Sequence, residues 1–316
     1  MSPQPLIEII TPAYNVEPYI DEFFQSLLAQ DYQNWRVLAR DDGSSDGTVK
    51  KLEAWQQHLG EKLRIIPNPG SINLGARGSF SLLFTLTTAP WVACGDSDDI
   101  WLPNRLSATY TAAAALAAEH GSDMPLLVSA DAYIVDDRLN RISDSVWSWQ
   151  GLDPGAITSF PRMLMDHPVL GATTLANRRA VEKAFPLPSP SIDHDWWLGL
   201  VVSSFGVCKI LPEKTMLYRR HGQNTSALPL TTSPLMALSQ ITNWKTRLNK
   251  IMNYVILQAR AFENRFAQEL SPAQKQTLHG LIALSNMSWA ERKITIIRRG
   301  LWFTSWRKNM VYWTLI

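Results

Sequence analysis

Apolar and polar positions in the first third of the chain follow the pattern of short buried strands that alternate with amphipathic helices. Apolar runs of four or five residues predict strands at 6–10, 35–39, 63–66 and 91–94. Between them, helically spaced apolar positions predict helices over 18–28, from the turn at 41–48 to about residue 59, and over 79–86. Strands that alternate with helices are typical of an α/β fold with a mostly parallel sheet.

The pattern changes after about residue 230, where helical periodicity replaces the alternation. We expect helices over 232–316 with boundaries near Gly280 and Gly300. Near the C-terminus, four apolar positions are spaced by four, four and three residues, which would place them on one helical face. These positions are Trp302, Trp306, Met310 and Trp313. The sequence therefore predicts one α/β domain over 1–230 and a helical region over 231–316.

Composition narrows the class of protein. Hydrophobic residues make up 46% of the 316 positions and charged residues 18%, which excludes a disordered chain. Two cysteines, Cys94 and Cys208, are too few for a disulfide framework. The first residues lack the pattern of a signal peptide, and no apolar run reaches the ~18 residues of a membrane span. We therefore expect a cytoplasmic protein.

Charge is unevenly distributed, although the net charge is only +2. Residues 1–230 hold 18 Lys/Arg and 25 Asp/Glu, a balance of −7, whereas residues 231–316 hold 12 and 3, a balance of +9. A basic, Trp-rich tail suits the surface of an anionic membrane. Packing of the tail on the α/β domain, or in a homodimer, is the alternative. The acidic body disfavours a nucleic acid partner.

Carboxylates gather where the predicted strands end. In parallel α/β sheets, ligands bind beyond the carboxyl ends of the strands. An acidic edge suits a divalent cation that carries a diphosphate. The double Asp before Gly-Ser is also a common turn, so that pair alone does not decide between ligand and turn. The five carboxylates are Asp41, Asp42, Asp96, Asp98 and Asp99.

Four segments, in this order and spacing, resemble glycosyltransferase family 2. They are IITPAYN at 9–15, RDDGSSDGT at 40–48, NLGAR at 73–77 and DSDD at 96–99. The resemblance continues at HDWW (194–197) and YRRHGQN (218–224), and it is closest to the bacterial rhamnosyltransferase-like branch of O-antigen, lipopolysaccharide and capsule synthesis. It implies a GT-A fold, in which a Rossmann-like sheet flanked by helices forms a catalytic domain over 1–230.

The resemblance implies a pocket for a nucleotide-sugar donor. Pro12 and Tyr14 would line the base and ribose pocket, and Asp42 would accept a hydrogen bond from the imide N–H of uracil or thymine. Arg77 would lie beside the nucleotide. Asp96 would hold the ribose.

The resemblance also implies the groups that perform the transfer. Asp98 and His221 would bind Mg²⁺ or Mn²⁺ together with the diphosphate, and Arg219 would approach the same group. Asp195 would be the general base, with Asp193 as its nearest rival. An imidazole ligand favours Mn²⁺. The two tryptophans at 196–197 are either core residues or a platform for the sugar.

The expected reaction is a single-step inverting transfer to a hydroxyl of a glycan or a lipid-linked acceptor, at the inner face of the cell membrane. The branch implies a dTDP-rhamnose donor. A UDP-hexose donor is one alternative. A non-catalytic subunit of a membrane glycan-assembly complex is another, but the complete acidic set argues against it.

Overall fold

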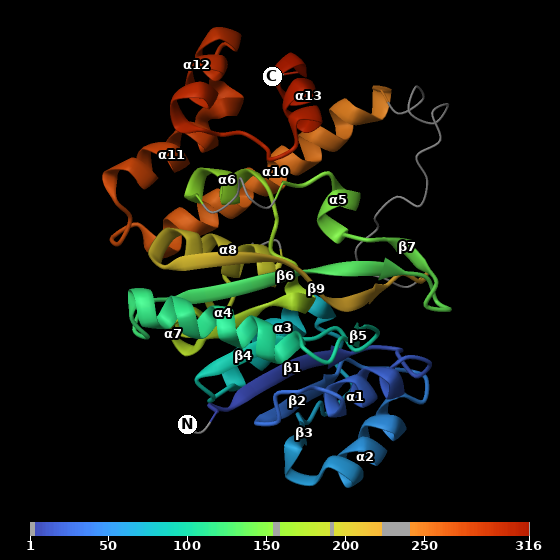
Figure 1. Ribbon diagram of the computed structural model, residues 1–316. Helices are drawn as coiled ribbons and strands as arrows, with labels where there is room; N and C mark the ends of the chain where they lie inside the picture. Colours follow the sequence, from blue (N-terminus) through green and yellow to red (C-terminus); the bar gives the residue numbers. More distant parts are fainter. Residues whose placement is uncertain (1–3, 154–158, 190–192, 223–240, 316) are drawn as a thin grey trace. The chain divides into compact units, whose positions relative to one another are not determined.

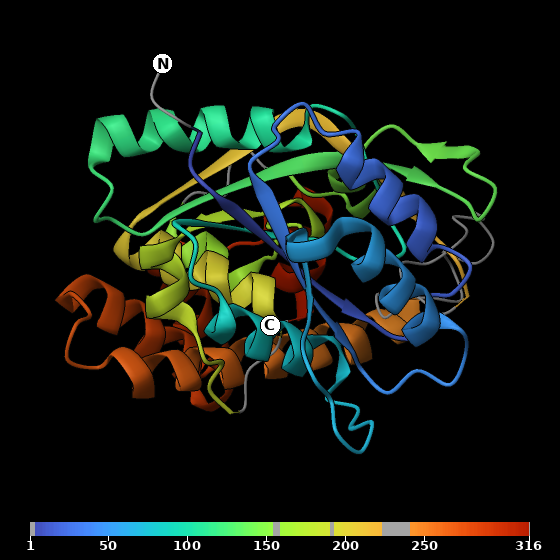
Figure 2. The same cartoon turned by 90° about the horizontal axis from the view of Figure 1, so that it is seen from below.

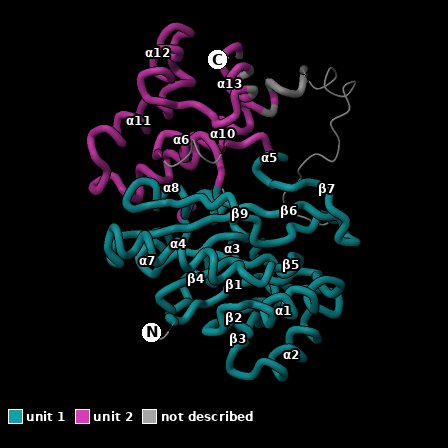
Figure 3. The backbone as a smooth tube through the Cα atoms, in the orientation of Figure 1, with its two compact units in different colours: residues 1–149, 169–187, 193–225 teal, residues 150–168, 188–192, 226–316 magenta. Residues whose placement is uncertain are grey.

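The computed structural model describes residues 4–153, 159–189, 193–222 and 241–315. The chain divides into two compact units, coloured separately in Figure 3. Unit 1 comprises residues 1–149, 169–187 and 193–225, and unit 2 comprises 150–168, 188–192 and 226–316. The predicted boundary near residue 230 lies outside the described residues. No local pattern of residues indicates that the chain enters unit 2 as early as residue 150.

Unit 1 is organised around one sheet whose strands run in the order β3-β2-β1-β4-β8-β6-β9-β5, with β7 paired to β6 (Figure 1). The strands of the described residues are β1 Ile7–Ala13, β2 Trp35–Asp41, β3 Leu63–Ile65, β4 Trp91–Cys94, β5 Ile100–Trp101, β6 Leu126–Val135, β7 Arg141–Ser143, β8 Leu175–Asn177 and β9 Val207–Arg219. All four strands expected in the first third are present.

The two parts of the sheet differ in strand direction. β1 pairs in parallel with β2 and β4, and β2 pairs in parallel with β3, as the alternation of strands and helices predicts. β6 and β9 are also parallel. Antiparallel pairing joins β8 to β4 and β6, β5 to β9, and β7 to β6. The fold is the predicted α/β class, with antiparallel pairs added in the second part.

Helices connect the strands and bury apolar stripes against them. α1 shows the expected pattern, because Ile20, Phe23, Phe24 and Leu27 are spaced by three, one and three residues and are all buried. α4 lies along β6 and β9 (Figure 2). The helices that lie wholly in unit 1 are α1 Ile20–Leu28, α2 Thr48–Leu59, α3 Gly75–Leu86, α4 Arg105–His120, α7 Arg178–Ala184 and α8 His194–Phe205, with 3₁₀ turns at Gly60–Lys62 and Gly171–Thr173. α5 Val146–Gln150 ends where unit 2 begins.

Unit 2 is helical, as predicted for the tail. Its helices are α6 Phe160–Met165, α10 Ile241–Phe266, α11 Pro272–Ala283, α12 Trp289–Arg299 and α13 Trp306–Leu315, with a 3₁₀ turn at Leu284–Asn286. Capping boxes begin α11 and α12, where Ser271 pairs with Gln274 and Ser288 with Glu291. Gly300 ends α12 in the left-handed conformation, with φ of 65°. None of the described helices combines the length and apolarity that crossing a membrane requires.

Two expectations about the tail are corrected. Gly280 lies inside α11, and the breaks fall after Phe266 and after Ala283 instead. Trp302 precedes α13, where its ring stacks on Trp313 with centroids 5.5 Å apart. The expected single apolar face is therefore divided between a stacked pair and the exposed residues Trp306 and Met310.

Candidate active site

Three of the predicted segments meet at the carboxyl ends of β1, β2 and β4. Backbone hydrogen bonds join Asp42 N–H to the Ala13 carbonyl at 2.8 Å and Gly95 N–H to the Ile10 carbonyl at 3.0 Å. The Ser97 hydroxyl donates to the Pro12 carbonyl at 2.9 Å. The acidic segment 96–99 is thus attached directly to the end of β1, as parallel strands in this register require.

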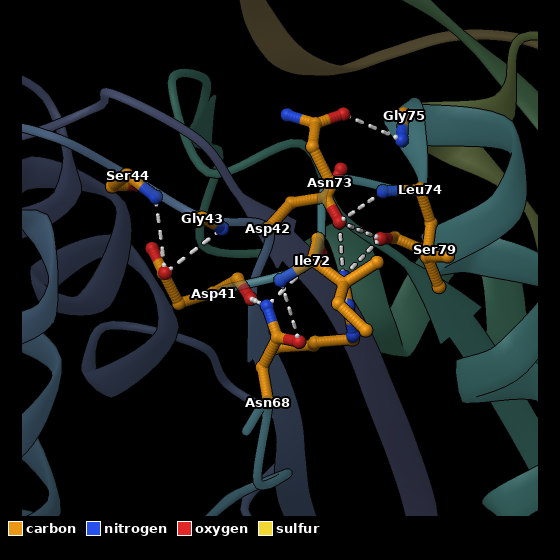
Figure 4. A network of polar contacts seen from close by, with 11 residues as sticks. Asp41, Asp42, Gly43, Ser44, Asn68, Ile72, Asn73, Leu74, Gly75 and Ser79 are labelled. Carbon is orange, nitrogen blue, oxygen red and sulfur yellow. Dashed lines mark hydrogen bonds and ion pairs between the residues drawn. The ribbon is translucent and has the colours of Figure 1, made fainter. Parts of the chain in front are cut away.

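Asp41 and Asp42 have different structural roles (Figure 4). Asp41 Oδ2 accepts from the N–H groups of Gly43 and Ser44 at 3.0 and 3.1 Å, so this residue caps the turn. The Gly43 position tolerates no side chain, because φ is +86° and a Cβ would lie 2.5 Å from the Ser71 carbonyl oxygen. The turn interpretation is therefore correct for Asp41.

Asp42 is buried and binds the segment that precedes α3. Its Oδ1 accepts from Leu74 N–H at 2.9 Å, from the Ser79 hydroxyl at 2.8 Å and from the Arg40 guanidinium (Figure 4). Arg40 also binds the Ile72 carbonyl at 2.8 Å. Asp42 and Arg40 therefore fix the strand end against the loop that leads to exposed Arg77.

The end of β9 reaches the acidic segment from the other part of the sheet. His221 Nε2 and Asp98 Oδ2 lie 2.8 Å apart, and both side chains are largely buried. Arg219 donates from its backbone N–H to Asp99 at 2.8 Å and from Nε to the Asp98 carbonyl at 2.9 Å. The His221 ring stacks on Tyr19 with centroids 4.7 Å apart. The expected pair Asp98 and His221 is thus brought together.

The Arg219 side chain contacts several separate segments of unit 1. Its Nη1 donates to the Asp137 carbonyl at 3.1 Å, and its Nη2 pairs with Glu22. The guanidinium also lies over the Tyr19 ring, 4.9 Å from the centroid. With its side chain 3% exposed, Arg219 orients the segment that carries Asp98.

Negative charge is concentrated around Asp96. Burial, then the carboxylates of Asp98 and Asp195, raise the pKa of Asp96 to about 7, and Arg105 opposes this effect. Burial and the same acidic neighbourhood raise the pKa of Asp99 well above its usual value. Asp96 is thus within electrostatic range of both Asp98 and Asp195. Together with the buried Asp99, it forms a cluster that a bound cation would neutralise.

The donor set fits an oxygen-preferring divalent cation, with part of its coordination left to the substrate. A carboxylate and an imidazole are suitable ligands for Mg²⁺ or Mn²⁺. The described part of the chain contains no group of three or more His, Cys, Asp or Glu side chains arranged to hold a metal. Diphosphate oxygens and water would therefore complete the shell around Asp98 and His221.

Asp195 lies in the first turn of α8 and is held by backbone groups. Its Oδ2 accepts from Gly171 N–H at 3.0 Å, and its Oδ1 accepts from Trp196 N–H at 2.8 Å. A Cβ at Gly171 would stand 2.8 Å from Asp195 Oδ2 and 3.0 Å from His194 Nε2. Gly171 therefore permits the close approach that positions this carboxylate.

The residues around Asp195 are structural. Trp196 and Trp197 are buried, and Trp197 Nε1 donates to the Ala184 carbonyl at 2.8 Å. The core interpretation of both tryptophans is therefore correct. The ring of His194 stacks on Phe80, with centroids 4.0 Å apart.

Arg105 is a residue that the sequence analysis missed. It is fully buried at the start of α4, and its Nη2 binds the Cys94 carbonyl at 2.6 Å and the Ala172 carbonyl. It stacks on Trp101, 3.7 Å from the ring centroid. Burial lowers the pKa of Arg105 to about 9, which leaves it charged at neutral pH. Arg105 thus joins the end of β4 to the turn that carries Gly171.

Comparison with solved structures identifies the class of fold. A structure of residues 1–349 of TarS from S. aureus with UDP-GlcNAc superposes with a TM-score of 0.57 at 16% identity, covering 92% of this chain and 78% of that one. A mannosyltransferase from Pyrobaculum calidifontis gives 0.51 at 14% identity, over 99% and 84%. Unit 1 thus has the GT-A fold of nucleotide-sugar transferases. The helical C-terminal region that the sequence predicts is also present.

Sequence comparison identifies the family of the N-terminal part. Residues 8–149 match the model of glycosyl transferase family 2, so this segment is a domain of that family. An uncharacterized glycosyltransferase of Haemophilus influenzae is 27% identical over 71% of this chain and 68% of its own length. The Escherichia coli glucosyltransferase WfgD, named for UDP-Glc and a diphosphoundecaprenol acceptor, is 35% identical over 32% of this chain and 38% of its own length. The rhamnosyltransferase-like branch stays a prediction.

Proposed function

We propose that this chain is a metal-dependent, inverting glycosyltransferase of bacterial cell-surface polysaccharide synthesis. It moves a sugar from a nucleoside diphosphate to a hydroxyl of a glycan or lipid-linked acceptor. The observation that carries the proposal is the link that Arg105 makes between the carbonyl of Cys94, two residues before Asp96, and the carbonyl of Ala172, in the turn whose Gly171 N–H binds Asp195. This link supports the proposal that a cation ligand, Asp98, and a proton acceptor, Asp195, serve one site.

Two events need these groups. Negative charge grows on the diphosphate as its bond to the sugar stretches, and a cation at Asp98 and His221 would supply the stabilisation of that charge. The acceptor hydroxyl is a weak nucleophile, and Asp195 takes its proton during attack, an effect of roughly 10²–10⁴-fold. Gly171 N–H and Trp196 N–H orient the carboxylate for this step. Direct displacement inverts the anomeric centre.

The remaining side chains bind and position the donor. We assign Pro12, exposed Tyr14 and Asp42 to the base, Arg77 to the nucleotide, and Asp96 to the ribose. Buried Arg219 acts by orienting the Asp98 segment beside the diphosphate.

The donor sugar has two candidates. The motif combination favours dTDP-rhamnose, whereas the names of TarS bound to UDP-GlcNAc and of WfgD favour a UDP-hexose. A thermal-shift panel of dTDP-, UDP- and GDP-sugars with and without Mn²⁺ separates them. We expect the transition temperature to rise with dTDP- or UDP-sugars, and only when the metal is present.

Turnover with the identified donor then tests the mechanism. We expect Asp195→Asn to lose ~10²-fold or more in kcat while the donor-induced thermal shift is retained. The neighbouring Asp193→Asn is the matched control and should stay close to wild type. Wild-type kcat in Asp195→Asn would overturn the assignment of the base. A trapped glycosyl-enzyme adduct would overturn the single-step mechanism, and a chain that binds donor but never transfers sugar would be the non-catalytic alternative.

A further inference from the structure

Helix α12 of unit 2 has two isoleucines, Ile294 and Ile297, on a side exposed to solvent. Ile294 and Ile297 are 49% and 60% exposed, whereas Lys293, next to Ile294 in the sequence, is only 6% exposed. This is the reverse of the usual arrangement, in which isoleucine is buried and lysine faces water. An exposed aliphatic face of this kind indicates an interaction surface.

The exposed residues form one face of the helix. Ala290, Ile294 and Ile297 are spaced by four and three residues, so their side chains lie within about 60° of one another around the helix axis. All three are exposed, and exposed Arg298 borders the same face. Trp289, 67% exposed, stands at the first position of the helix. We call Ala290, Ile294, Ile297 and Arg298 the α12 face, and Trp289 flanks it on the side of Lys293.

Packing fixes the rotation of α12, so the face cannot turn inward. Ile296 is fully buried, and Lys293 Nζ lies 4.1 Å from the ring centroid of Trp313 in α13. On the α11 side, a Cβ at Gly280 would stand 3.1 Å from Thr295 Cγ2, which shows how closely the helices approach. The Ser288 capping box and Gly300 fix both ends of the helix.

The segment that carries the α12 face is mostly basic. Residues 289–316 contain six Lys/Arg and one acidic residue, Glu291, whose carboxylate is bound to the helix cap. Trp306 and Met310 of the neighbouring α13 add further exposed apolar surface. Aliphatic and Trp side chains bordered by cations are the combination that binds the interface of an anionic bilayer.

A second copy of the chain fits this face less well. A twofold interface would place the α12 face against itself and bring the two Arg298 side chains, with their basic surroundings, toward each other. Like charges that face each other across an interface oppose association. Glu291 cannot compensate for them without leaving the helix cap.

We propose that the α12 face, formed by Ala290, Ile294, Ile297 and Arg298 and flanked by exposed Trp289, docks on the surface of an anionic lipid bilayer. The apolar side chains enter the interface between headgroups and acyl chains, and Arg298 contacts the lipid phosphates. This attachment needs neither donor nor metal. It therefore holds or fails independently of the proposed transfer reaction.

Co-sedimentation of the full-length protein with vesicles tests the proposal. We expect binding to phosphatidylcholine vesicles that contain phosphatidylglycerol, and much weaker binding to phosphatidylcholine alone. Ile294→Gln/Ile297→Gln should weaken binding to the anionic vesicles by about tenfold or more, because two side chains that would enter the bilayer interface become polar. Arg298→Gln should weaken it about fivefold and reduce its dependence on salt.

The matched control is Leu28→Gln/Met124→Gln, which makes the same kind of change at two exposed apolar positions of unit 1. It should bind vesicles as the wild type does, and the circular dichroism of all variants should be unchanged. Equal vesicle binding by wild type and Ile294→Gln/Ile297→Gln would overturn the proposal. So would a dimer, seen by sedimentation velocity without vesicles, that becomes monomeric only in Ile294→Gln/Ile297→Gln, because a second copy would then cover the face.

Discussion

A single methyl group at Gly171 should displace the proposed base. In Gly171→Ala, the new Cβ would stand 2.8 Å from Asp195 Oδ2, whereas ordinary contact begins at 3.4 Å. The carboxylate or the turn must therefore move by 3.4 − 2.8 = 0.6 Å. Residue 171 does not have a positive φ, so the alanine backbone is not strained. The methyl group acts through its contact with Asp195 and His194.

The expected loss of kcat follows from the dependence of the reaction rate on the position of the Asp195 carboxylate. A misplacement of about 1 Å can cost about 10²-fold, so we expect kcat of Gly171→Ala to fall by roughly 10- to 100-fold. The donor KM should change little, because the residues assigned to donor binding lie on other segments. Stability should change by less than about 2 kcal/mol, since the clash and the reduced entropy of the unfolded chain oppose each other.

The assay is the initial rate at saturating donor and acceptor, together with the thermal transition. Ala172→Gly is the control, because it loosens the same 3₁₀ turn without adding an atom near Asp195. We expect it to lower the transition temperature more than it lowers kcat. Wild-type kcat in Gly171→Ala would show that the new methyl group does not displace the carboxylate. An equally large loss of kcat in Ala172→Gly would show that loosening of the turn, and not displacement of Asp195, lowers kcat.

Three further predictions follow from buried polar groups. Arg105→Met should reduce the unfolding free energy by roughly 2 kcal/mol in denaturant titrations and also reduce kcat, because the carbonyls of Cys94 and Ala172 lose their shared donor. An unchanged unfolding free energy and an unchanged kcat would contradict the role of Arg105 in joining β4 to the Gly171 turn. Burial raises the pKa of Cys94 and Cys208 to about 12, so neither thiol should react with a disulfide reagent at pH 8 until the protein unfolds, and rapid labelling of the native protein would refute this. Lys293→Met should raise the transition temperature, because burial lowers the pKa of Lys293 and no described group accepts a hydrogen bond from its Nζ. A lower transition temperature would show that the contact of Lys293 with Trp313 matters more.

Local patterns in the sequence predict much of the secondary structure of unit 1. The apolar runs that predicted β1, β2, β3 and β4 are short, bounded by turn residues and buried, so a local pattern suffices to find them. Carboxylates that follow such runs were expected to meet at one edge of the sheet, and the hydrogen bond from Ser97 to the Pro12 carbonyl attaches residues 96–99 to the end of β1. The pairing of His221 with Asp98 was expected only from the family resemblance, because 123 residues separate them.

Other features could not be read from local patterns. An arginine at the start of an alanine-rich helix looks like a surface residue, yet Arg105 is buried because a distant turn supplies one of its two carbonyl partners. Of the five carboxylates expected at the sheet edge, Asp42 and Asp99 are buried, because backbone N–H groups far along the chain bind them. Gly280 looked like a helix end, but the close approach of α12 explains a glycine there.

The direct connection of α8 to β9 has a consequence for how specificity can change. Gly206 joins them at a point where any side chain would collide with the Pro125 carbonyl, so helix, turn and strand form one continuous piece of chain that packs closely against the residue before β6. That piece begins beside Asp195 and leads to Arg219 and His221, while the residues assigned to the nucleotide all come from the first hundred positions. The residues proposed to recognise the nucleotide base and the residue proposed to deprotonate the acceptor hydroxyl therefore come from separate parts of the sequence. A hybrid enzyme could exchange one part and keep the other.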